Sequence, residues 1–260
     1  MIMIQPIGGL CNRMRAINSA YMLSKERKDK LTVIWFNNSE LNCPFEQLFQ
    51  KHDDLTILNI YSKWNIKKLF HQFSSQFISN EEIKTNKTDG LLTESYRNSL
   101  GKKIYIATEE HFYPNHSYEL FVPTHEIQQR IDHMCAHFGS NPVGVHIRRT
   151  DNAPAIGKSS TKAFIQAMEK ELADNPETMF YLATDDLREE SNLRSHFAGR
   201  ILSNENRDLS RDSVRGIEDA MLDLYCLSKT NKIIGSFFSS FTDIAADMNA
   251  IPKIIATEES

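Results

Sequence analysis

The second half of the chain alternates short apolar runs with amphipathic stretches. The apolar runs at 143–147 and 179–183 are typical of buried strands, and Ile217, Ala220 and Leu224 recur at helical spacing. Strands that alternate with helices of about 10–15 residues favour a parallel sheet covered by helices on both faces. The strands predicted for this half are 143–147, 179–183, 200–202, 232–235 and 251–256, and the helices are 160–173, 186–197, 217–227 and 241–248.

The first half follows the same plan less regularly. Apolar residues alternate from Met1 to Ile7 and predict a strand, which a tight turn at Gly8 and Gly9 joins to a helix at 12–27. Residues 61–103 show no clear pattern, and 109–124, with two prolines, is typical of an irregular connection. Further strands are predicted at 31–36, 55–60 and 104–108.

A break near the middle divides the chain into two parts. A predicted helix at 125–138 ends at Gly139-Ser-Asn-Pro142, a sequence that interrupts regular structure. At about 150 residues per domain, the length suits one large domain or two small ones. We predict an N-terminal domain at 1–125 and a C-terminal domain at 126–260.

Composition narrows the class of protein. The chain is 40% hydrophobic and 25% charged, as soluble globular proteins are, and its net charge of −4 leaves no basic excess for general nucleic-acid binding. No apolar run approaches the roughly 20 residues of a membrane span, and the N-terminus lacks a basic signal region. We therefore expect no integral membrane segment and a cytoplasmic location. The four cysteines, Cys11, Cys43, Cys135 and Cys226, are far apart and are expected to be free thiols.

The turn after the first predicted strand is a candidate ligand site. Gly8 and Gly9 let the backbone approach a ligand, the following helix offers N–H groups to an anion, and Asn12 and Arg13 add donors. The spacing is not G-x-G-x-x-G, so the NAD fingerprint is absent. The alternative is a purely structural turn.

Two clusters follow predicted strands of the second half. His146, Arg148 and Arg149 stand at the end of the 143–147 strand, where ligands bind in parallel sheets, and guanidinium groups match the oxygens of a diphosphate. The alternative is a solvated arginine pair bridged to Asp151. Directly after the next strand comes an acidic pair, which suits a metal, a base or a ligand acceptor, or else a helix cap. This pair is Asp185 and Asp186.

Three features further along the chain are weaker. Asp223 lies in an apolar helix and has the carboxylate that a guanine edge requires, and Ser239 and Ser240 open a helix whose N–H groups suit phosphate; a solvated acid and an ordinary cap are the alternatives. His133 and His137 have zinc-ligand spacing without a third ligand. The aromatic residues at 61–77 and 105–121 suit sugar stacking, but we expect them to pack the first domain.

Taken in order, the motifs resemble the α-1,6-fucosyltransferase and O-fucosyltransferase superfamily, most densely over 143–246 and again at 7–24. The resemblance implies an α/β, GT-B-like fold with two Rossmann-like domains facing a central cleft. The N-terminal domain would be the acceptor side and the C-terminal domain the nucleotide-sugar donor side. It further implies inverting, metal-independent transfer of fucose from GDP-fucose to a glycan acceptor, without a cofactor.

The resemblance also assigns roles to residues. Arg148 is similar to the arginine that binds the β-phosphate and assists the leaving group, Asp223 to the acid that reads guanine, and Asn12 to an asparagine facing the donor. The predicted catalytic residues are Arg148, Asp151 and Asp185. The predicted donor-binding residues are Gly9, Asn12, Arg13, His146, Arg148, Arg149, Asp185, Asp186, Asp223, Ser239 and Ser240.

The sequence differs from the α-1,6 branch at the positions that would supply the catalytic base. Asn152 stands where that branch has a lysine, and Ile156 approximately where it has a glutamate, so the base of that branch is not transferable. Asp151, Asp185 and Glu109 are the candidates in this chain. Two other functions remain open: the same fold using another nucleotide sugar, and a non-catalytic nucleotide-binding or glycan-binding module.

Overall fold

The computed structural model describes residues 1–62, 64–114, 117–150 and 153–258, apart from the side chains at 67 and 153–155. The chain forms two compact units. Unit 1 comprises Met1–Thr124 and Ser210–Glu218, and unit 2 comprises His125–Leu209 and Asp219–Ser260. The segment 210–218 joins unit 1 through Asn42, which donates a backbone hydrogen bond to the Arg211 carbonyl at 3.1 Å. The predicted boundary between residues 125 and 126 does not include this return of the chain to unit 1.

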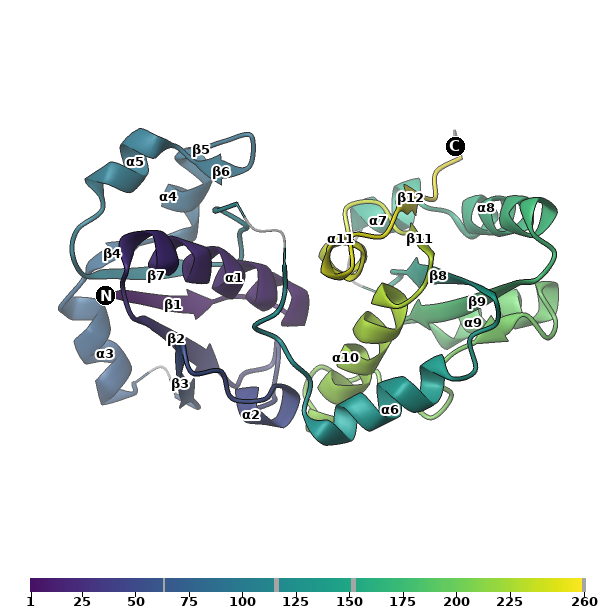
Figure 1. Ribbon diagram of the computed structural model, residues 1–260, viewed down its shortest axis with the longest axis horizontal. Helices are drawn as coiled ribbons and strands as arrows, with labels where there is room; N and C mark the ends of the chain where they lie inside the picture. The colour runs from purple at the N-terminus through teal and green to yellow at the C-terminus, as the bar shows by residue number, and fades with distance from the viewer. Residues whose placement is uncertain (63, 115–116, 151–152, 259–260) are drawn as a thin grey trace. The chain divides into compact units, whose positions relative to one another are not determined.

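Unit 1 is built on a parallel sheet with the strand order β3-β2-β1-β7-β4 (Figure 1). The register places Ile4 of β1 beside Val33 of β2 and Ile106 of β7, and all three side chains are fully buried. Apolar side chains at the centre of the sheet therefore fix its register. The strands are β1 (Ile2–Pro6), β2 (Leu31–Phe36), β3 (Leu55–Ile60), β4 (Gln76–Ile78) and β7 (Ile104–Thr108).

The region 61–103, where the pattern predicts no element, contains several short ones. Each of its helices begins at a side chain that accepts a backbone N–H: Asn65 before α3, Ser79 before α4 and Thr93 before α5. Such short helices show too few turns for periodicity to reveal them. The elements of unit 1 besides its sheet are α1 (Leu10–Arg27), α2 (Phe45–Leu48), α3 (Ile66–Phe73), α4 (Asn80–Thr85), β5 (Lys87–Thr88), β6 (Leu91–Leu92) and α5 (Glu94–Ser99).

The aromatic residues of the first half separate into two groups. Tyr105, Phe112 and Phe121 are buried, as expected from the sequence. Trp64 and Phe73 are instead 82% and 84% exposed. The expectation that the aromatic residues at 61–77 pack the first domain is therefore wrong, because the apolar side of α3 faces solvent.

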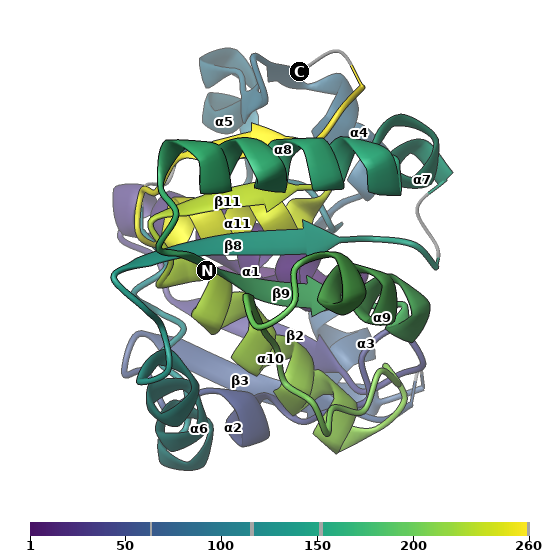
Figure 2. The same cartoon turned by 90° about the vertical axis from the view of Figure 1, so that its right-hand side faces the viewer.

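Unit 2 repeats the plan with a parallel sheet of order β10-β9-β8-β11-β12. Figure 2 shows β8 between β9 and β11, with the three arrows pointing the same way. The strands are β8 (Asn141–Ile147), β9 (Thr178–Thr184), β10 (Ile201–Leu202), β11 (Lys232–Gly235) and β12 (Lys253–Ile255). The helices are α6 (His125–Cys135), α7 (Ala153–Lys158), α8 (Thr161–Asp174), α9 (Leu187–His196), α10 (Val214–Ser228) and α11 (Ser240–Met248).

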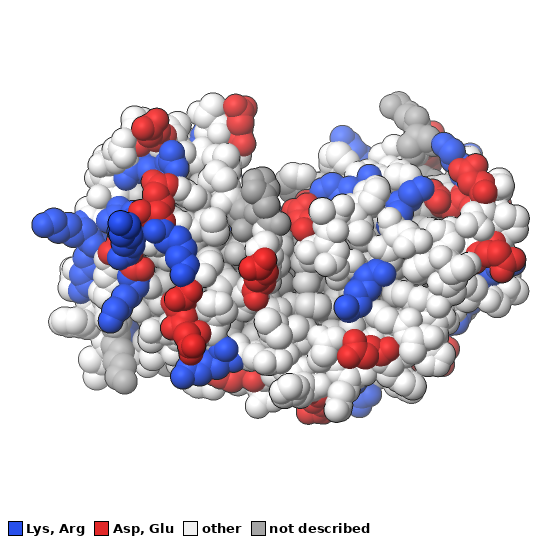
Figure 3. Space-filling view, in the orientation of Figure 1, with Lys and Arg blue, Asp and Glu red and all other residues white. Residues whose placement is uncertain are grey.

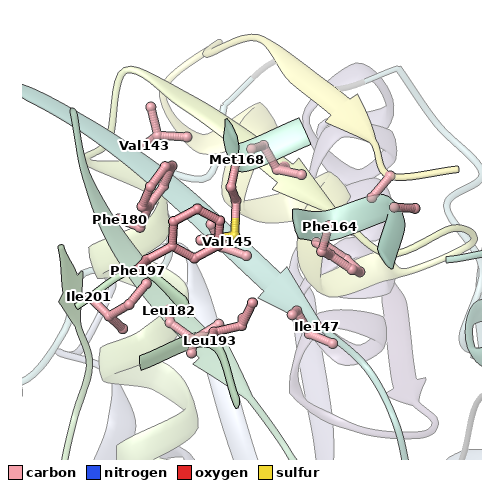
Figure 4. Packing of buried hydrophobic residues seen from close by; sticks show 13 residues of the cluster. Val143, Val145, Ile147, Phe164, Met168, Phe180, Leu182, Leu193, Phe197 and Ile201 are labelled. Atoms are coloured by element: carbon pink, nitrogen blue, oxygen red, sulfur yellow. The ribbon is translucent and has the colours of Figure 1, made fainter. Parts of the chain in front are cut away.

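Helices cover both faces of this sheet. On one face, Phe164 and Met168 of α8 and Leu193 of α9 pack on Val145 in the core (Figure 4). On the other face, α11 approaches so closely that a Cβ added at Gly235 would lie 2.2 Å from Cγ2 of Thr242. The tight packing holds the first turn of α11 against the ends of β8 and β11.

The strands predicted at 31–36, 55–60, 104–108 and 232–235 are confirmed with these limits. The predicted alternation of strands and helices in the second half is confirmed as well. No helix among the described residues is long and apolar enough to cross a membrane.

Candidate functional site

The strand order of unit 2 creates a switch point between β8 and β11. The chain runs from β8 outward through β9 to β10 and then returns by α10 to the opposite side of β8. In open α/β sheets, ligands bind beyond the carboxyl ends of the strands at such a point. Arg148 follows β8 and Ser236 follows β11, so both stand at this position.

Arg148 is held at the switch point through its backbone. Its N–H donates to Oγ of Ser236 at 2.9 Å, and the same hydroxyl donates to the carbonyl of His146 at 3.3 Å. The guanidinium Nε lies 3.6 Å from Oδ2 of Asp185, and 22% of the Arg148 side chain is exposed. A cation is thus fixed at the end of β8 with part of its surface open to a ligand.

Asp185 organises the loop that contains Arg148. Its Oδ1 accepts the N–H of Arg149 at 2.7 Å, and its Oδ2 accepts the hydroxyl of Thr150 at 2.7 Å and the N–H of Thr150 at 3.3 Å. Both carboxylate oxygens are therefore used within the protein. Asp185 is a positioning residue in this arrangement, and its use as the base remains a prediction.

Arg149 has a different environment from Arg148. Its Nε donates to Oε1 of Glu189 at 2.5 Å, and Nη1 donates to the carbonyl of Ser159 at 2.9 Å. The side chain is 11% exposed and lies over the ring of Phe164. It ties the loop after β8 to α8 and α9, so its predicted contact with a donor finds no support in its position.

His146 connects β8 with the first turn of α11. Its ring stacks on Phe241 with centroids 4.7 Å apart, and Nδ1 lies 2.8 Å from the hydroxyl of Thr242. Burial, reinforced by the charge of Arg148, lowers the pKa of His146 to about 3, so the ring is neutral at pH 7. The histidine orients α11 and is not a cation for phosphate.

The hydroxyl residues and the second acid lie at helix starts. Ser239 is the N-cap position of α11, yet its side chain makes no capping bond, and Ser240 is the first helical residue. The first-turn N–H groups of a helix offer donors to an anion, and α11 begins shortly after β11 ends. Asp186 instead caps α9 by accepting the N–H of Arg188 at 2.8 Å, so the capping interpretation of Asp186 agrees with the structure.

Asp223 is buried in α10. Its Oδ1 accepts the hydroxyl of Tyr181 at 2.6 Å, and burial raises the pKa of Asp223 to about 7. The carboxyl therefore faces β9 inside the unit. Reading a guanine edge requires that Tyr181 release it, so this role stays a prediction.

Unit 1 has its own switch point between β1 and β7. Gly8 and Gly9 follow β1, and Glu109 follows β7. Gly8 has φ +81°, which glycine adopts without strain, and Gly9 is the N-cap of α1. Asn12 in the first turn of α1 donates to Oε2 of Glu109 at 3.0 Å. The turn thus places an amide and a carboxylate together.

Arg13 is fully buried and structural in its contacts. Nε donates to the Gly8 carbonyl at 2.7 Å, Nη1 to the Phe36 carbonyl at 2.5 Å and Nη2 to Asn38 at 2.9 Å, with Trp35 beneath the guanidinium. Burial lowers its pKa to about 10. Because the Arg13 side chain is buried, its position does not support the predicted contact with a donor. Arg13 instead shapes the turn at Gly8.

Several remaining predictions can be placed. Asp151 lies outside the described residues. Cys11, Cys43, Cys135 and Cys226 are free thiols, as predicted. Within the described ranges, no group of three or more histidine, cysteine or acidic side chains could hold a metal ion.

The sequence analysis did not single out Ser236 or Glu189. Ser236 directly follows the Lys232–Gly235 strand, so its place after a strand end was a signal that pointed to the switch point. Glu189 has no signal of that kind, because its ion pair with Arg149 joins residues 40 positions apart. Only the folded structure brings the side chains of Arg149 and Glu189 together.

The two sheets and their switch points define an α/β fold of the kind in which ligands bind beyond the strand ends. No protein-family model matches the chain, and no curated protein matches it. Solved structures do. The chain is similar to NodZ α-1,6-fucosyltransferase soaked with GDP-fucose, with a TM-score of 0.66 and 16% identity, over 95% of this chain and 92% of that one.

Two further solved structures show the same likeness. An Arabidopsis thaliana FUT1 mutant in complex with GDP has a TM-score of 0.66 and 15% identity, over 99% of this chain and 70% of that one. POFUT1 in complex with GDP-fucose has a TM-score of 0.64 and 10% identity, over 98% and 97%. The α/β, GT-B-like fold class is thereby confirmed, and the predicted resemblance to fucosyltransferases is confirmed as a likeness of fold.

Proposed function

We propose that the protein is a glycosyltransferase that binds GDP-fucose at the switch point of unit 2 and transfers fucose to a carbohydrate acceptor. The observation that supports this most is the placement of Arg148 at the end of β8, where Ser236 and Asp185 hold it beside the first turn of α11. The likeness of fold to proteins solved with GDP or GDP-fucose favours this donor class.

The proposed chemistry is an inverting displacement. The acceptor hydroxyl oxygen attacks the anomeric carbon of fucose, the bond from that carbon to the phosphate oxygen breaks, and GDP leaves with the electron pair. Negative charge grows on the diphosphate during this step. We expect Arg148, which follows β8, and the N–H groups at the start of α11 to stabilise that charge, because fixed donors aimed at a developing charge lower such a barrier.

Of the three candidate bases, we propose Glu109 as the group that takes the proton of the acceptor hydroxyl. Asp185 already accepts three hydrogen bonds from the loop after β8. Glu109 stands at the end of β7, and among the side-chain contacts that place it there is the 3.0 Å bond from Asn12. A carboxylate can act as a general base when the acceptor hydroxyl lies within hydrogen-bond reach of it.

We further propose that transfer needs no metal. Arg148 supplies the positive charge that a divalent cation would otherwise bring to the diphosphate. Both acids of the Asp185–Asp186 pair accept backbone N–H groups, which accounts for them without a metal. Activity in EDTA should equal activity in Mg²⁺, and a strict need for Mg²⁺ would overturn this part.

A nucleotide panel in a thermal-shift assay tests the donor assignment. GDP and GDP-fucose should raise the melting temperature in EDTA, and UDP and ADP should not. Arg148→Ala should abolish the shift, whereas Arg188→Ala, a matched control whose side chain is 93% exposed, should keep it. A flat response to all four nucleotides, or an unchanged shift in Arg148→Ala, would contradict the proposal.

Two results would point to the alternative functions. A larger shift with GDP-mannose than with GDP-fucose would indicate the same fold using another sugar. Binding of GDP-fucose without any release of GDP, over a set of glycan acceptors, would indicate a binding module.

A further inference from the structure

Helix α3 of unit 1 exposes its apolar side. Ile66, Phe70 and Phe73 recur at the spacing of one helix face, and they are 83%, 65% and 84% exposed. In Figure 3 the described atoms at the lower left edge, where Figure 1 draws α3, are mostly white, with blue ones just above them. An amphipathic helix of a folded domain normally buries its apolar face. Helix α3 instead turns Ile66, Phe70 and Phe73 toward solvent.

The polar side of α3 is the side that meets the protein. Lys68 and Gln72 are half-buried, and Nζ of Lys68 lies 5.4 Å from the ring centre of Phe36 on β2. The helix is therefore docked on unit 1 by its polar residues. Ile66, Phe70 and Phe73 remain largely exposed and available to a partner, whereas Leu69 is half-buried.

Other apolar side chains extend this exposed surface. Tyr61 and Trp64 precede the helix and are 70% and 82% exposed, and Phe77 on the edge strand β4 is 45% exposed. A large exposed apolar area marks an interaction surface more often than scattered single residues do. We call this set the α3 patch; it comprises Tyr61, Trp64, Ile66, Phe70, Phe73 and Phe77.

The segment that contains the α3 patch has basic residues and no acidic ones. The sequence has no aspartate or glutamate from Leu55 to Asn80, and its charged residues there are lysines. From the bend just before β7, Lys103 places Nζ 5.4 Å from the ring centre of Phe70 and donates to Oγ of Ser74 at 2.5 Å. Basic groups therefore border the aromatic rings.

We propose that the α3 patch docks unit 1 on the surface of an anionic lipid bilayer. Apolar side chains of a short helix enter the boundary between head groups and acyl chains, while lysines stay at the level of the phosphates. Tryptophan and tyrosine favour that same boundary. A glycan-stacking surface would not require the three aliphatic and benzyl side chains of α3, nor lysines in the same segment.

The docking goes beyond the proposed glycosyl transfer, and vesicle binding without nucleotide tests it separately. The full chain is mixed with phosphatidylcholine vesicles, with or without phosphatidylglycerol, and floated on a density gradient. The chain should float with the anionic vesicles and stay behind with the neutral ones. Added salt should weaken the binding, because the lysine–lipid attraction is screened.

Variants locate the contact. Phe70→Ser combined with Phe73→Ser should weaken binding to anionic vesicles by about tenfold or more, since two exposed rings lose their apolar insertion. Leu187→Ser is the matched control, because Leu187 of α9 is also a large apolar residue, 60% exposed, in unit 2. It should bind as the unchanged chain does. Circular dichroism of both variants verifies that they fold.

Four results would overturn the proposal. They are no flotation of the unchanged chain, equal flotation with neutral and anionic vesicles, full binding by the Phe70/Phe73 double variant, and equal loss in Leu187→Ser. A dimer in analytical ultracentrifugation that the double variant abolishes, without vesicle binding, would assign the α3 patch to a second copy of the chain instead.

Discussion

Replacing Asp223 by asparagine should stabilise the protein at alkaline pH. The side chain keeps its volume, and Oδ1 still accepts the hydroxyl of Tyr181, which lies 2.6 Å from it. The change removes a carboxyl group whose pKa burial raises from 3.8 to about 7. Between these two pH values the unfolded chain loses the proton and the folded chain keeps it, so the wild-type protein loses stability as the pH rises.

The pKa difference sets the size of the effect. At about 1.4 kcal/mol per unit, a rise from 3.8 to about 7 amounts to roughly 4 kcal/mol of lost stability at pH 8. At pH 5 less than half of that loss has developed. The asparagine amide brings a fixed hydrogen-bonding cost at both pH values, so the comparison between them isolates the titration. We expect Asp223→Asn to gain about 2–3 kcal/mol more over the wild type at pH 8 than at pH 5.

Urea unfolding followed by far-ultraviolet circular dichroism measures this difference. Tryptophan fluorescence is unsuitable, because Trp35 and Trp64 are both in unit 1 and Asp223 is in unit 2. Tyr181→Phe serves as a second variant. It removes a hydrogen bond that lowers the pKa of Asp223, so it should increase the loss at pH 8. An asparagine variant with the same gain at both pH values, or a larger gain at pH 5, would refute the reasoning.

Three further predictions concern the switch point of unit 2. Gly235→Ala should lower the free energy of unfolding by about 1–3 kcal/mol in urea titrations, because the new Cβ would lie 2.2 Å from Cγ2 of Thr242. Asp185→Ala should weaken GDP binding about tenfold in calorimetry, since the loop that presents Arg148 loses three hydrogen bonds. His146 has a folded pKa of about 3 against 6.5 unfolded, so its contribution falls as the pH drops below 6.5; relative to His146→Asn, the wild type should lose about 2 kcal/mol of stability between pH 7 and pH 5. Unchanged stability in the first case, unchanged affinity in the second, or parallel pH curves in the third would contradict these expectations.

The fold was largely predictable because most of its elements bury one face. The strands at 55–60 and 232–235 are short stretches rich in leucine and isoleucine, and their limits agree with the structure. Helix α3 was not predictable as a surface feature. Its eight residues span too few turns for a helical pattern to stand out, and only the structure shows that the apolar side faces outward.

The site was predictable in its location but less in its details. Arg148 and Asp185 each follow a predicted strand. Parallel strands bring their carboxyl ends to one edge of the sheet, and the structure has these two side chains 3.6 Å apart there. Local sequence does not distinguish an arginine facing a ligand from one facing Glu189, and Arg149 is the second kind. The same limit applies to Arg13, whose acceptors come from Gly8 and from residues 23 and 25 positions away.

A crystal structure with GDP bound tests the central claim most directly. The account predicts that the β-phosphate lies within hydrogen-bond distance of the Arg148 guanidinium and of N–H groups in the first turn of α11. GDP bound elsewhere on the chain, or at this position with its phosphates turned away from Arg148, would contradict it.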